Sequence, residues 1–320
     1  MKHDDQSCQH LAKTLPVLDT DSQEYYPDIA THLLRSKHVR QTFKVQVALP
    51  VRRRGEARRF PVIYCTDGNL TFDVLKGICY SMQMSGNPAG HCALVGIGYP
   101  GDSPAAGAVL RARDMTFPGY PQLCTSPPNL QGVLVAEPGA KDFYGADDFQ
   151  QFLQQELVPL IDETYDTVVE ERTYFGHSLG AGFGLYTMFT RSSLFQNYIL
   201  SSPGLIYHGR SSAGIQYDDY DFALALVRQH IASSNHLRGM KVYLSVGSEE
   251  EFEPPLAQWR FTSSLYRMIA LLKRSAIPGL ELTTEVIEGE SHMSVWPIAF
   301  IHGLRAVVGI RYREETTKSA

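Results

Sequence analysis

The sequence predicts an α/β fold with a mostly parallel central sheet and helices on both faces. Short runs typical of strands recur along the chain, and amphipathic patterns typical of helices lie between the later runs. A strand, a helix and a further strand in succession form a right-handed crossover, so such strands lie parallel in one sheet. The expected strands are residues 43–49, 60–65, 92–97, 173–175, 198–200, 241–246 and 282–287.

The first two strands differ in pattern. Residues 43–49 alternate between apolar and polar side chains, as a half-buried strand does, and Pro50 ends the run. Residues 60–65 are continuously apolar, which is typical of a strand buried on both faces. We expect the two to pair as an antiparallel hairpin at the edge of the sheet. The basic segment 52–59 between them is then interpreted as a solvated tip and not as a nucleic-acid or lipid patch.

Three helices are predicted with defined positions. Between Asp147 and Tyr165 six apolar side chains fall on one helical face, and Pro159 is expected to kink this helix. The other two run from about residue 257 to 274 and onward from Pro297.

Residues 100–145 interrupt the alternation of strands and helices. Periodicity is lost there, and proline and glycine are frequent. A stretch of this length without clear elements inside a compact domain is usually functional, so we interpret it as a lid or substrate-binding insertion. We expect residues 1–320 to form one domain, with residues 1–34 as an N-terminal extension.

Composition excludes several classes of protein. With 43% hydrophobic and 20% charged residues and a net charge of −5, the chain is typical of a globular protein whose surface is not built for nucleic acid. There is no run of 18 apolar residues and no apolar N-terminal stretch, so no membrane insertion is expected. The five cysteines form neither a disulfide framework nor a zinc pattern, which favours the cytoplasm; they are Cys8, Cys65, Cys79, Cys92 and Cys124.

Gly176-His-Ser-Leu-Gly180 is the one G-x-S-x-G motif in the chain. An expected strand precedes it, and a small-residue helix start at 181–186 follows it. This is the setting that a nucleophile elbow requires, because the glycines allow a tight turn that exposes the serine hydroxyl at the carboxyl edge of the sheet. The motif therefore predicts an α/β-hydrolase fold with Ser178 as nucleophile; a structural Gly-Ser turn is the alternative.

A serine hydroxyl needs a histidine base, and the base needs a carboxylate that orients it. In α/β-hydrolases the chain order is serine, acid, histidine. His292 follows the last expected strand and is the predicted base, whereas four other histidines lie on or beside helical segments: His208, His230, His236 and His302. The acid is expected just after the strand at 241–246, where Glu250 is favoured, Glu249 is the runner-up and Glu251 stays open.

Two backbone N–H groups should bind the oxyanion. One belongs to Leu179, the residue after the nucleophile, and the other is expected from the loop after residues 60–65, where Asn69 is favoured. No metal or organic cofactor is expected, because protein groups activate the serine. Trp259 and Trp296 are candidate pocket walls, although tryptophans near helix starts more often serve packing.

Several segments together resemble the putative-esterase family of α/β-hydrolases, which includes the ferric-enterobactin and salmochelin esterases and is related to feruloyl esterases and mycolyltransferases. The resemblance extends from about residue 35 to 308. Ala181 departs from it, standing where many relatives have glycine, and residues 120–137 are longer and richer in proline. The segments that carry it are residues 62–68, 111–118, 139–143, 172–180, 194–203 and 289–295.

The resemblance implies a Ser-His-Glu hydrolase that cleaves a small-molecule carboxylic ester, with siderophore lactones as one substrate class. It also implies that Arg113, and less directly Arg111, contacts an anionic substrate, while an internal Arg113–Asp114 salt bridge is an equal alternative. His177, beside the nucleophile, is a further candidate substrate contact.

Two other functions stay open. An acyltransferase would use the same acyl-enzyme with an acceptor other than water. A binding protein on a hydrolase fold is disfavoured, because all three catalytic positions can be filled in the expected order. The sequence makes no prediction of the oligomeric state.

Overall fold

The structure, a computed structural model, describes residues 29–51, 59–101, 104–121, 144–190, 194–210, 214–232, 237–254 and 256–309. Some features expected from the sequence lie outside these ranges: Cys8, Cys124, His236, residues 52–58 of the basic segment, residues 1–28 of the N-terminal extension, and residues 102–103 and 122–143 of the insertion.

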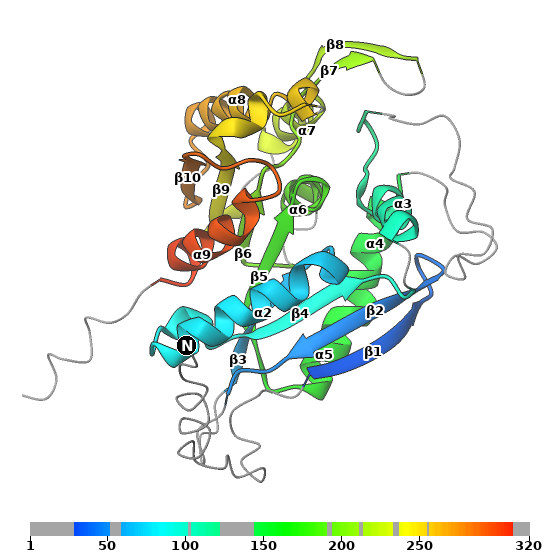
Figure 1. Ribbon diagram of the computed structural model, residues 1–320, viewed down its shortest axis with the longest axis vertical. Helices are drawn as coiled ribbons and strands as arrows, with labels where there is room; N and C mark the ends of the chain where they lie inside the picture. The colour runs from blue at the N-terminus through cyan, green and yellow to red at the C-terminus, as the bar shows by residue number, and fades with distance from the viewer. Residues whose placement is uncertain are drawn as a thin grey trace, which may run out of the picture.

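Eight strands form the main sheet, in the order β1-β2-β4-β3-β5-β6-β9-β10. Strand β2 pairs antiparallel with β1 and with β4, and all the other pairs are parallel, which confirms the predicted mostly parallel sheet (Figure 1). The strands are β1 (Ile29–Ser36), β2 (Gln41–Ala48), β3 (Phe60–Cys65), β4 (Ala93–Gly98), β5 (Thr167–His177), β6 (Asn197–Ser201), β9 (Lys241–Gly247) and β10 (Glu281–Ile287).

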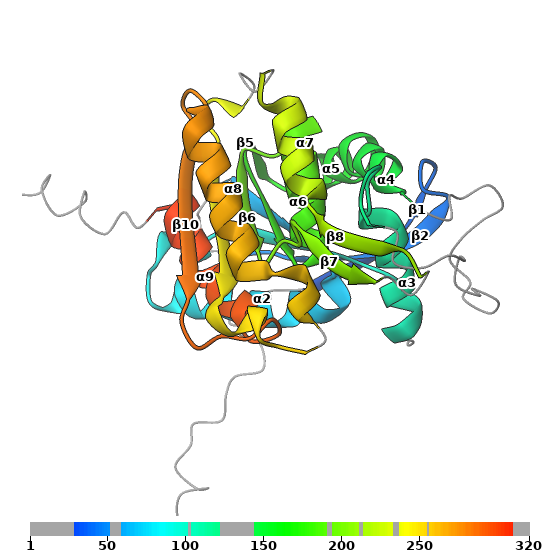
Figure 2. The same cartoon turned by 90° about the horizontal axis from the view of Figure 1, so that it is seen from above.

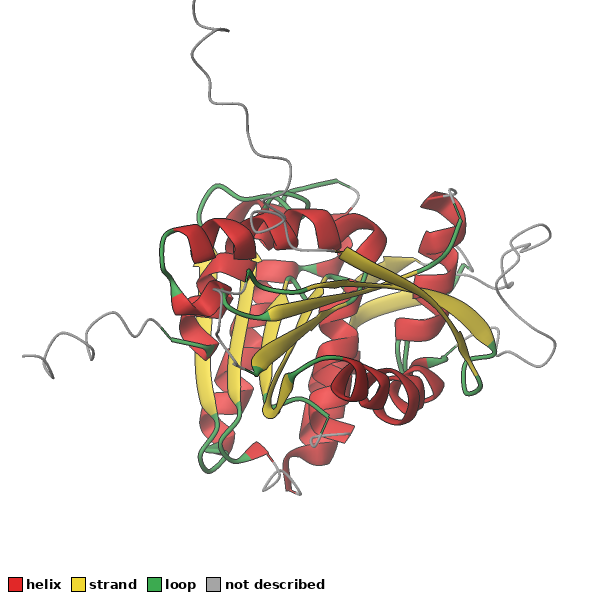
Figure 3. Ribbon diagram, turned by 90° about the horizontal axis from the view of Figure 1, so that it is seen from below, coloured by secondary structure: helices red, strands yellow, loops and turns green. Residues whose placement is uncertain are grey.

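Helices cover both faces of this sheet, as predicted (Figures 2 and 3). In β3, Ile63 and Cys65 pack on the side of α2 (Gly68–Met84) and α9 (Val295–Val307). Alternate side chains of the same strand face the larger core cluster on the opposite side. That side carries α3 (Pro104–Met115), α4 (Ala146–Phe152), α5 (Val158–Thr164), α6 (Leu179–Thr190), α7 (Phe222–His230) and α8 (Phe261–Ser275).

The expected hairpin between residues 43–49 and 60–65 is wrong. Strand β2 pairs with β1 and β4, whereas β3 lies between β4 and β5. The continuous apolarity of β3 fits this interior place, since both of its faces are covered. We did not predict β1, whose side chains alternate between exposed and half-buried at the edge of the sheet.

The predicted helix at 147–165 exists, but a π-helical turn divides it. Helix α4 leads into η2 (Leu153–Leu157), and α5 follows with Pro159 in its first turn. Proline has no N–H to donate and its ring crowds the preceding turn, so the wider π-helical turn accommodates it. The other two predicted helices correspond to α8 and α9.

The insertion is more regular than expected, because α3 occupies part of it. Its sequence, PAAGAVLRARDM, begins with proline and contains glycine, which hides a helical pattern. Five shorter elements complete the described chain: η1 (Pro88–Gly90), the strands β7 (Tyr207–Arg210) and β8 (Gln216–Tyr220) of a separate two-stranded sheet, η4 (Ser248–Glu251) and η5 (Leu256–Trp259). None of the helices in the described ranges combines the length and apolar character needed to cross a bilayer.

Candidate active site

Ser178 lies in a sharp turn between β5 and α6. Its φ of 56° falls in the left-handed region, which is strained for a residue with a side chain. Gly176 and Gly180 make the turn possible, because a Cβ on Gly176 would clash with the Gly180 carbonyl. The Ser178 N–H donates to the Ser201 carbonyl at 2.9 Å, which ties the turn to β6. The motif thus adopts the predicted strand-turn-helix geometry at the carboxyl edge of the sheet.

His292 and Glu250 form a buried pair at the same edge. His292 lies in the loop between β10 and α9, and Glu250 in η4 just after β9. The His292 Nδ1 is 2.6 Å from the Glu250 Oε2. An ionised carboxylate only accepts hydrogen bonds, so Nδ1 carries the proton and Nε2 is left as an acceptor.

Two further donors hold the Glu250 carboxylate. Its Oε1 accepts hydrogen bonds from the Ser202 hydroxyl and the Gly247 N–H, each at 2.6 Å. Glu250 is 0% exposed, and a carboxylate without water needs such donors to stay charged. The two bonds to Oε1 therefore hold the carboxylate so that Oε2 faces the His292 ring.

The neighbouring glutamates have other partners. Glu249 accepts from the Ser248 hydroxyl at 3.0 Å, and Glu251 accepts from the N–H and hydroxyl of Ser263. Glu253 accepts the backbone N–H of His292 at 2.9 Å and so fixes the loop rather than the ring. Of these glutamates, Glu250 is the one that contacts the imidazole.

Two other rings pack against the His292 ring. The ring centroid of His177 is 4.5 Å away and that of Phe261 is 4.6 Å away. Burial, reinforced by His292 and Arg111, lowers the pKa of His177 well below its ordinary value, so this neighbour stays uncharged at neutral pH. We did not predict the contact of Phe261, because that residue lies at the start of α8, far from any motif.

A pocket of about 670 Å³ opens at this edge. Ser178 and His292 both line it, so the predicted nucleophile and base face one cavity. The other lining residues are Asp67, Asn69, Leu70, Thr71, Tyr99, Pro100, Gly101, Gly107, Ala108, Arg111, His177 and Met293.

Arg111 brings a positive charge to the wall of the pocket. Its Nε and Nη2 donate to the two carboxylate oxygens of Asp67 at 2.5 and 2.9 Å. The Arg111 side chain keeps 28% of its surface exposed and lines the pocket together with Asp67. Asp67 was not predicted, although it stands directly before Gly68 in the loop that we expected to bind the oxyanion.

Two residues predicted to contact substrate, Arg113 and Trp296, lie outside the pocket. Arg113 is buried, donates from Nε to Asp114 at 2.6 Å and contacts Gln41, so the structure has the internal salt bridge weighed above. Trp296 is buried in the core between the sheet and α9. Neither residue is among those that line the pocket. Trp259 packs edge-on against Tyr207.

The two predicted oxyanion donors lie in the first turns of helices. Leu179 is the first residue of α6 and Asn69 the second residue of α2, and N–H groups in a first turn have no partner within their own helix. The Asn69 side chain accepts from the Tyr99 N–H at 2.6 Å and donates to the Tyr99 carbonyl at 2.8 Å. This pair of bonds fixes the start of α2 against the end of β4.

Comparison with known proteins finds relatives that are described as esterases. The family described as Putative esterase matches residues 131–307. Ferri-bacillibactin esterase BesA of Bacillus subtilis is 25% identical over 284 residues, which cover 87% of this chain and 89% of that protein. Siderophore triacetylfusarinine C esterase of Aspergillus fumigatus is 26% identical over 260 residues, covering 76% and 80%.

Solved structures extend the likeness to the fold. The BES protein from Bacillus cereus superposes with a TM-score of 0.68 at 25% identity, covering 87% of this chain and 95% of that one. The enterobactin and salmochelin hydrolase IroE has a TM-score of 0.61 at 20% identity, covering 89% and 96%. These likenesses confirm the predicted fold class over most of the chain.

Proposed function

The chain belongs to the putative-esterase family and is a serine hydrolase of carboxylic esters, and we propose that Ser178, His292 and Glu250 are its catalytic triad. The observation that carries this assignment is the buried 2.6 Å contact between His292 and Glu250, beside a pocket that Ser178 also lines. Among the described residues, Glu285 and His302 also follow Ser178 in the order serine, acid, histidine, but their side chains are partly exposed and do not line the pocket, so burial and the pocket favour Glu250 and His292.

The first chemical step uses the proton positions inferred above. The Ser178 Oγ attacks the ester carbonyl carbon while the His292 Nε2 takes the hydroxyl proton. The imidazole then carries a positive charge, which the Glu250 carboxylate stabilises through Nδ1–H. Because the donors of Ser202 and Gly247 hold Glu250 in place, the ring keeps its orientation as the charge develops.

The carbonyl oxygen becomes an oxyanion in this step. We assign its two donors to the Leu179 and Asn69 backbone N–H groups, each in the first turn of a helix whose N-terminal end favours negative charge. When the tetrahedral intermediate collapses, the imidazolium protonates the leaving alkoxide and an acyl-enzyme remains on Ser178. Water activated by His292 then releases the acid.

For the substrate we propose a small-molecule ester of the siderophore type. The support is that two relatives with matches over three quarters of this chain or more are named as siderophore esterases. Arg111 at the pocket wall is suited to an anionic group of such a compound, and His177 beside it to a neutral polar contact. Arg113 and Trp296 are left out of this substrate assignment, since both are buried away from the pocket.

We further propose a single domain and a cytoplasmic location. All described strands except β7 and β8 belong to one sheet, which supports the first point. The Sγ atoms of Cys79 and Cys92 lie 3.8 Å apart as free thiols, and a reducing compartment would keep them so.

Replacing the nucleophile tests the assignment. Ser178→Ala should abolish turnover of p-nitrophenyl butyrate and labelling by a fluorophosphonate probe, while the circular dichroism spectrum stays unchanged. Ser275→Ala, at the end of α8, is the matched control and should retain both. Turnover in Ser178→Ala would refute the proposal, and absence of labelling in the wild-type chain would favour a binding protein. Partitioning of the acyl group between water and an added alcohol separates hydrolase from acyltransferase.

A further inference from the structure

One buried tyrosine links the two segments that carry the proposed oxyanion donors. Tyr174 lies in β5 with 0% exposure, four residues before Ser178. Its hydroxyl donates to the Gly180 carbonyl at 2.7 Å and lies 3.1 Å from the Thr66 Oγ1. Since the tyrosine proton goes to Gly180, the Thr66 hydroxyl is the donor in the second bond. Gly180 belongs to the first turn of α6, and Thr66 directly follows β3.

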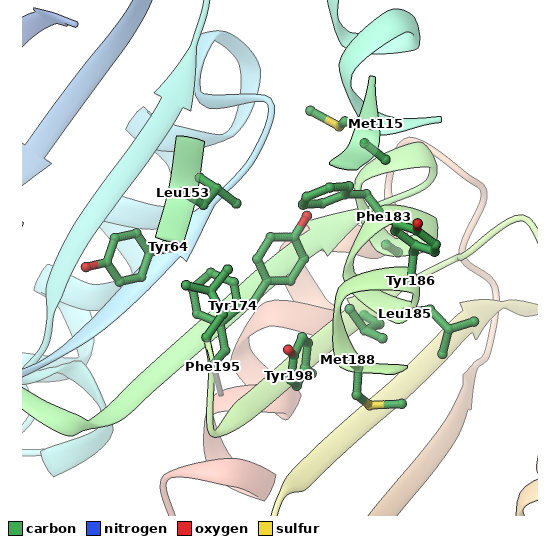
Figure 4. Packing of buried hydrophobic residues seen from close by; sticks show 14 of the residues in the cluster. Tyr64, Met115, Leu153, Tyr174, Phe183, Leu185, Tyr186, Met188, Phe195 and Tyr198 are labelled. Atoms are coloured by element: carbon green, nitrogen blue, oxygen red, sulfur yellow. The ribbon is translucent and has the colours of Figure 1, made fainter. Parts of the chain in front are cut away.

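The glycines of α6 bring these groups into contact. A Cβ on Gly180 would lie 2.5 Å from the Thr66 Oγ1 and 3.3 Å from the Asp67 Oδ2. A Cβ on Gly184, one turn later on the same helical face, would lie 2.5 Å from the Tyr174 ring. Figure 4 shows the Tyr174 side chain rising from β5 beside α6. Helix α6 can therefore approach the tyrosine and the loop this closely only with glycine at both positions.

Thr66 extends the link to α2. Its carbonyl accepts the Thr71 hydroxyl at 3.0 Å, and its N–H donates to the Phe175 carbonyl at 3.4 Å. Thr71 lies in the first turns of α2, two residues after Asn69. Hydrogen bonds thus run without interruption from the start of α6 through Tyr174 and Thr66 to the start of α2.

We propose that the Tyr174 and Thr66 hydroxyls are positioning groups that set the separation between the Leu179 and Asn69 N–H groups. The inference rests on the proposed oxyanion assignment. Two donors on separate helices stabilise one oxygen only if their spacing matches it, because oxyanion bonds act over a narrow range of distances. The pair touches no substrate and acts through the backbone of its neighbours.

A neighbouring buried tyrosine, Tyr198, provides a control for the role of the Tyr174 hydroxyl. Tyr198 pairs with Tyr174 in the register between β5 and β6 and is equally buried, but its hydroxyl has no hydrogen-bond partner in the described part of the chain. Removing that hydroxyl leaves packing almost unchanged and breaks no bond. Tyr198→Phe is therefore a control for the loss of a buried phenolic hydroxyl as such.

The test compares steady-state kinetics on p-nitrophenyl acetate. Tyr174→Phe should lower kcat by about 10-fold or more while KM changes by less than about 3-fold, because a misplaced donor affects the transition state more than substrate binding. Tyr198→Phe should match the wild type in both constants. Thr66→Val should reproduce the effect of Tyr174→Phe, and Thr66→Ser, which keeps the hydroxyl, should restore most of kcat.

A tetrahedral inhibitor gives a readout that a structural role would not move. An alkyl boronic acid forms a tetrahedral adduct with the serine, so its inhibition constant should rise in parallel with the loss of kcat across these variants. Wild-type kcat in both Tyr174→Phe and Thr66→Val would overturn the inference, as would equal losses in Tyr198→Phe. If Ser178→Ala keeps its turnover, the proposed function fails instead, so the two failures are distinguishable.

Discussion

Among the residues after Ser178 that the structure describes, two His–Glu side-chain pairs occur, one buried and one exposed. His292 and Glu250 are buried, 2.6 Å apart, beside the pocket that Ser178 lines. His302 and Glu285 are 3.0 Å apart with 34% and 35% of their side-chain surface exposed, on α9 and β10. The exposed pair is solvated and its attraction is weak. Both glutamates accept a further side-chain hydrogen bond, so burial and the pocket that Ser178 lines are what distinguish the first pair.

Neutralising each carboxylate in turn should give the largest difference between the two pairs. Glu250→Gln should lower kcat by about 10³-fold, because the amide cannot stabilise the imidazolium and can hold the wrong tautomer. Glu285→Gln should leave kcat within about 2-fold of the wild type. Both are measured with p-nitrophenyl butyrate at saturating concentration. Equal effects of the two substitutions would contradict the assignment of Glu250.

A smaller effect is expected from the groups that hold each glutamate. Ser202→Ala removes the donor to the Glu250 Oε1 and should lower kcat by about 10-fold with little change in KM. Tyr243→Phe removes the corresponding donor to Glu285 and should leave kcat unchanged. A kcat for Ser202→Ala equal to that of the wild type would show that the Gly247 N–H alone suffices to orient the carboxylate.

The smallest effect concerns the histidine beside His292. The pKa of His177 lies well below its ordinary value of 6.5 when folded, so the unfolded chain binds the extra proton first as the pH falls. Stability contributed by neutral His177 is therefore present above pH 6.5 and is lost progressively below it. The free energy of unfolding in urea should fall less between pH 7.5 and 5.5 in His177→Gln than in the wild type.

The control for this measurement is the interval from pH 7.5 to 8.5, where His177 is neutral in both states and the two chains should change alike. Parallel curves down to pH 5.5 would mean that His177 is not the buried neutral group described above.

The fold could be predicted from the sequence because most strands and helices have a recognisable local pattern. The run at 60–65 is apolar on both sides, and β3 is indeed an interior strand. Its partner could not be predicted, since periodicity states that a strand exists but not which neighbour it pairs with. Strand β1 was missed because its exposed edge position leaves it without an apolar face.

The sequence likewise predicts some of the site residues and leaves others unresolved. Ser178 could be predicted because the flanking glycines are those that a tight turn requires. Glu249, Glu250 and Glu251 look alike in sequence, and only the turn at η4 orients one of them, Glu250, toward His292. Arg111 and Arg113 could not be separated without knowing that α3 is a helix. Residues two apart on a helix point to nearly opposite sides, which sends one to the pocket and the other to the core.

The parts of the Ser178 pocket come from distant stretches of the chain: Asp67 and Asn69 after β3, Arg111 in α3, Ser178 after β5, and His292 after β10. Parallel strands bring them together only when the sheet has assembled from β3 across to β10. Such long-range pairing is a slow part of folding. Recovered esterase activity therefore serves as a reporter of the finished fold, and during renaturation it should lag behind the return of helical signal.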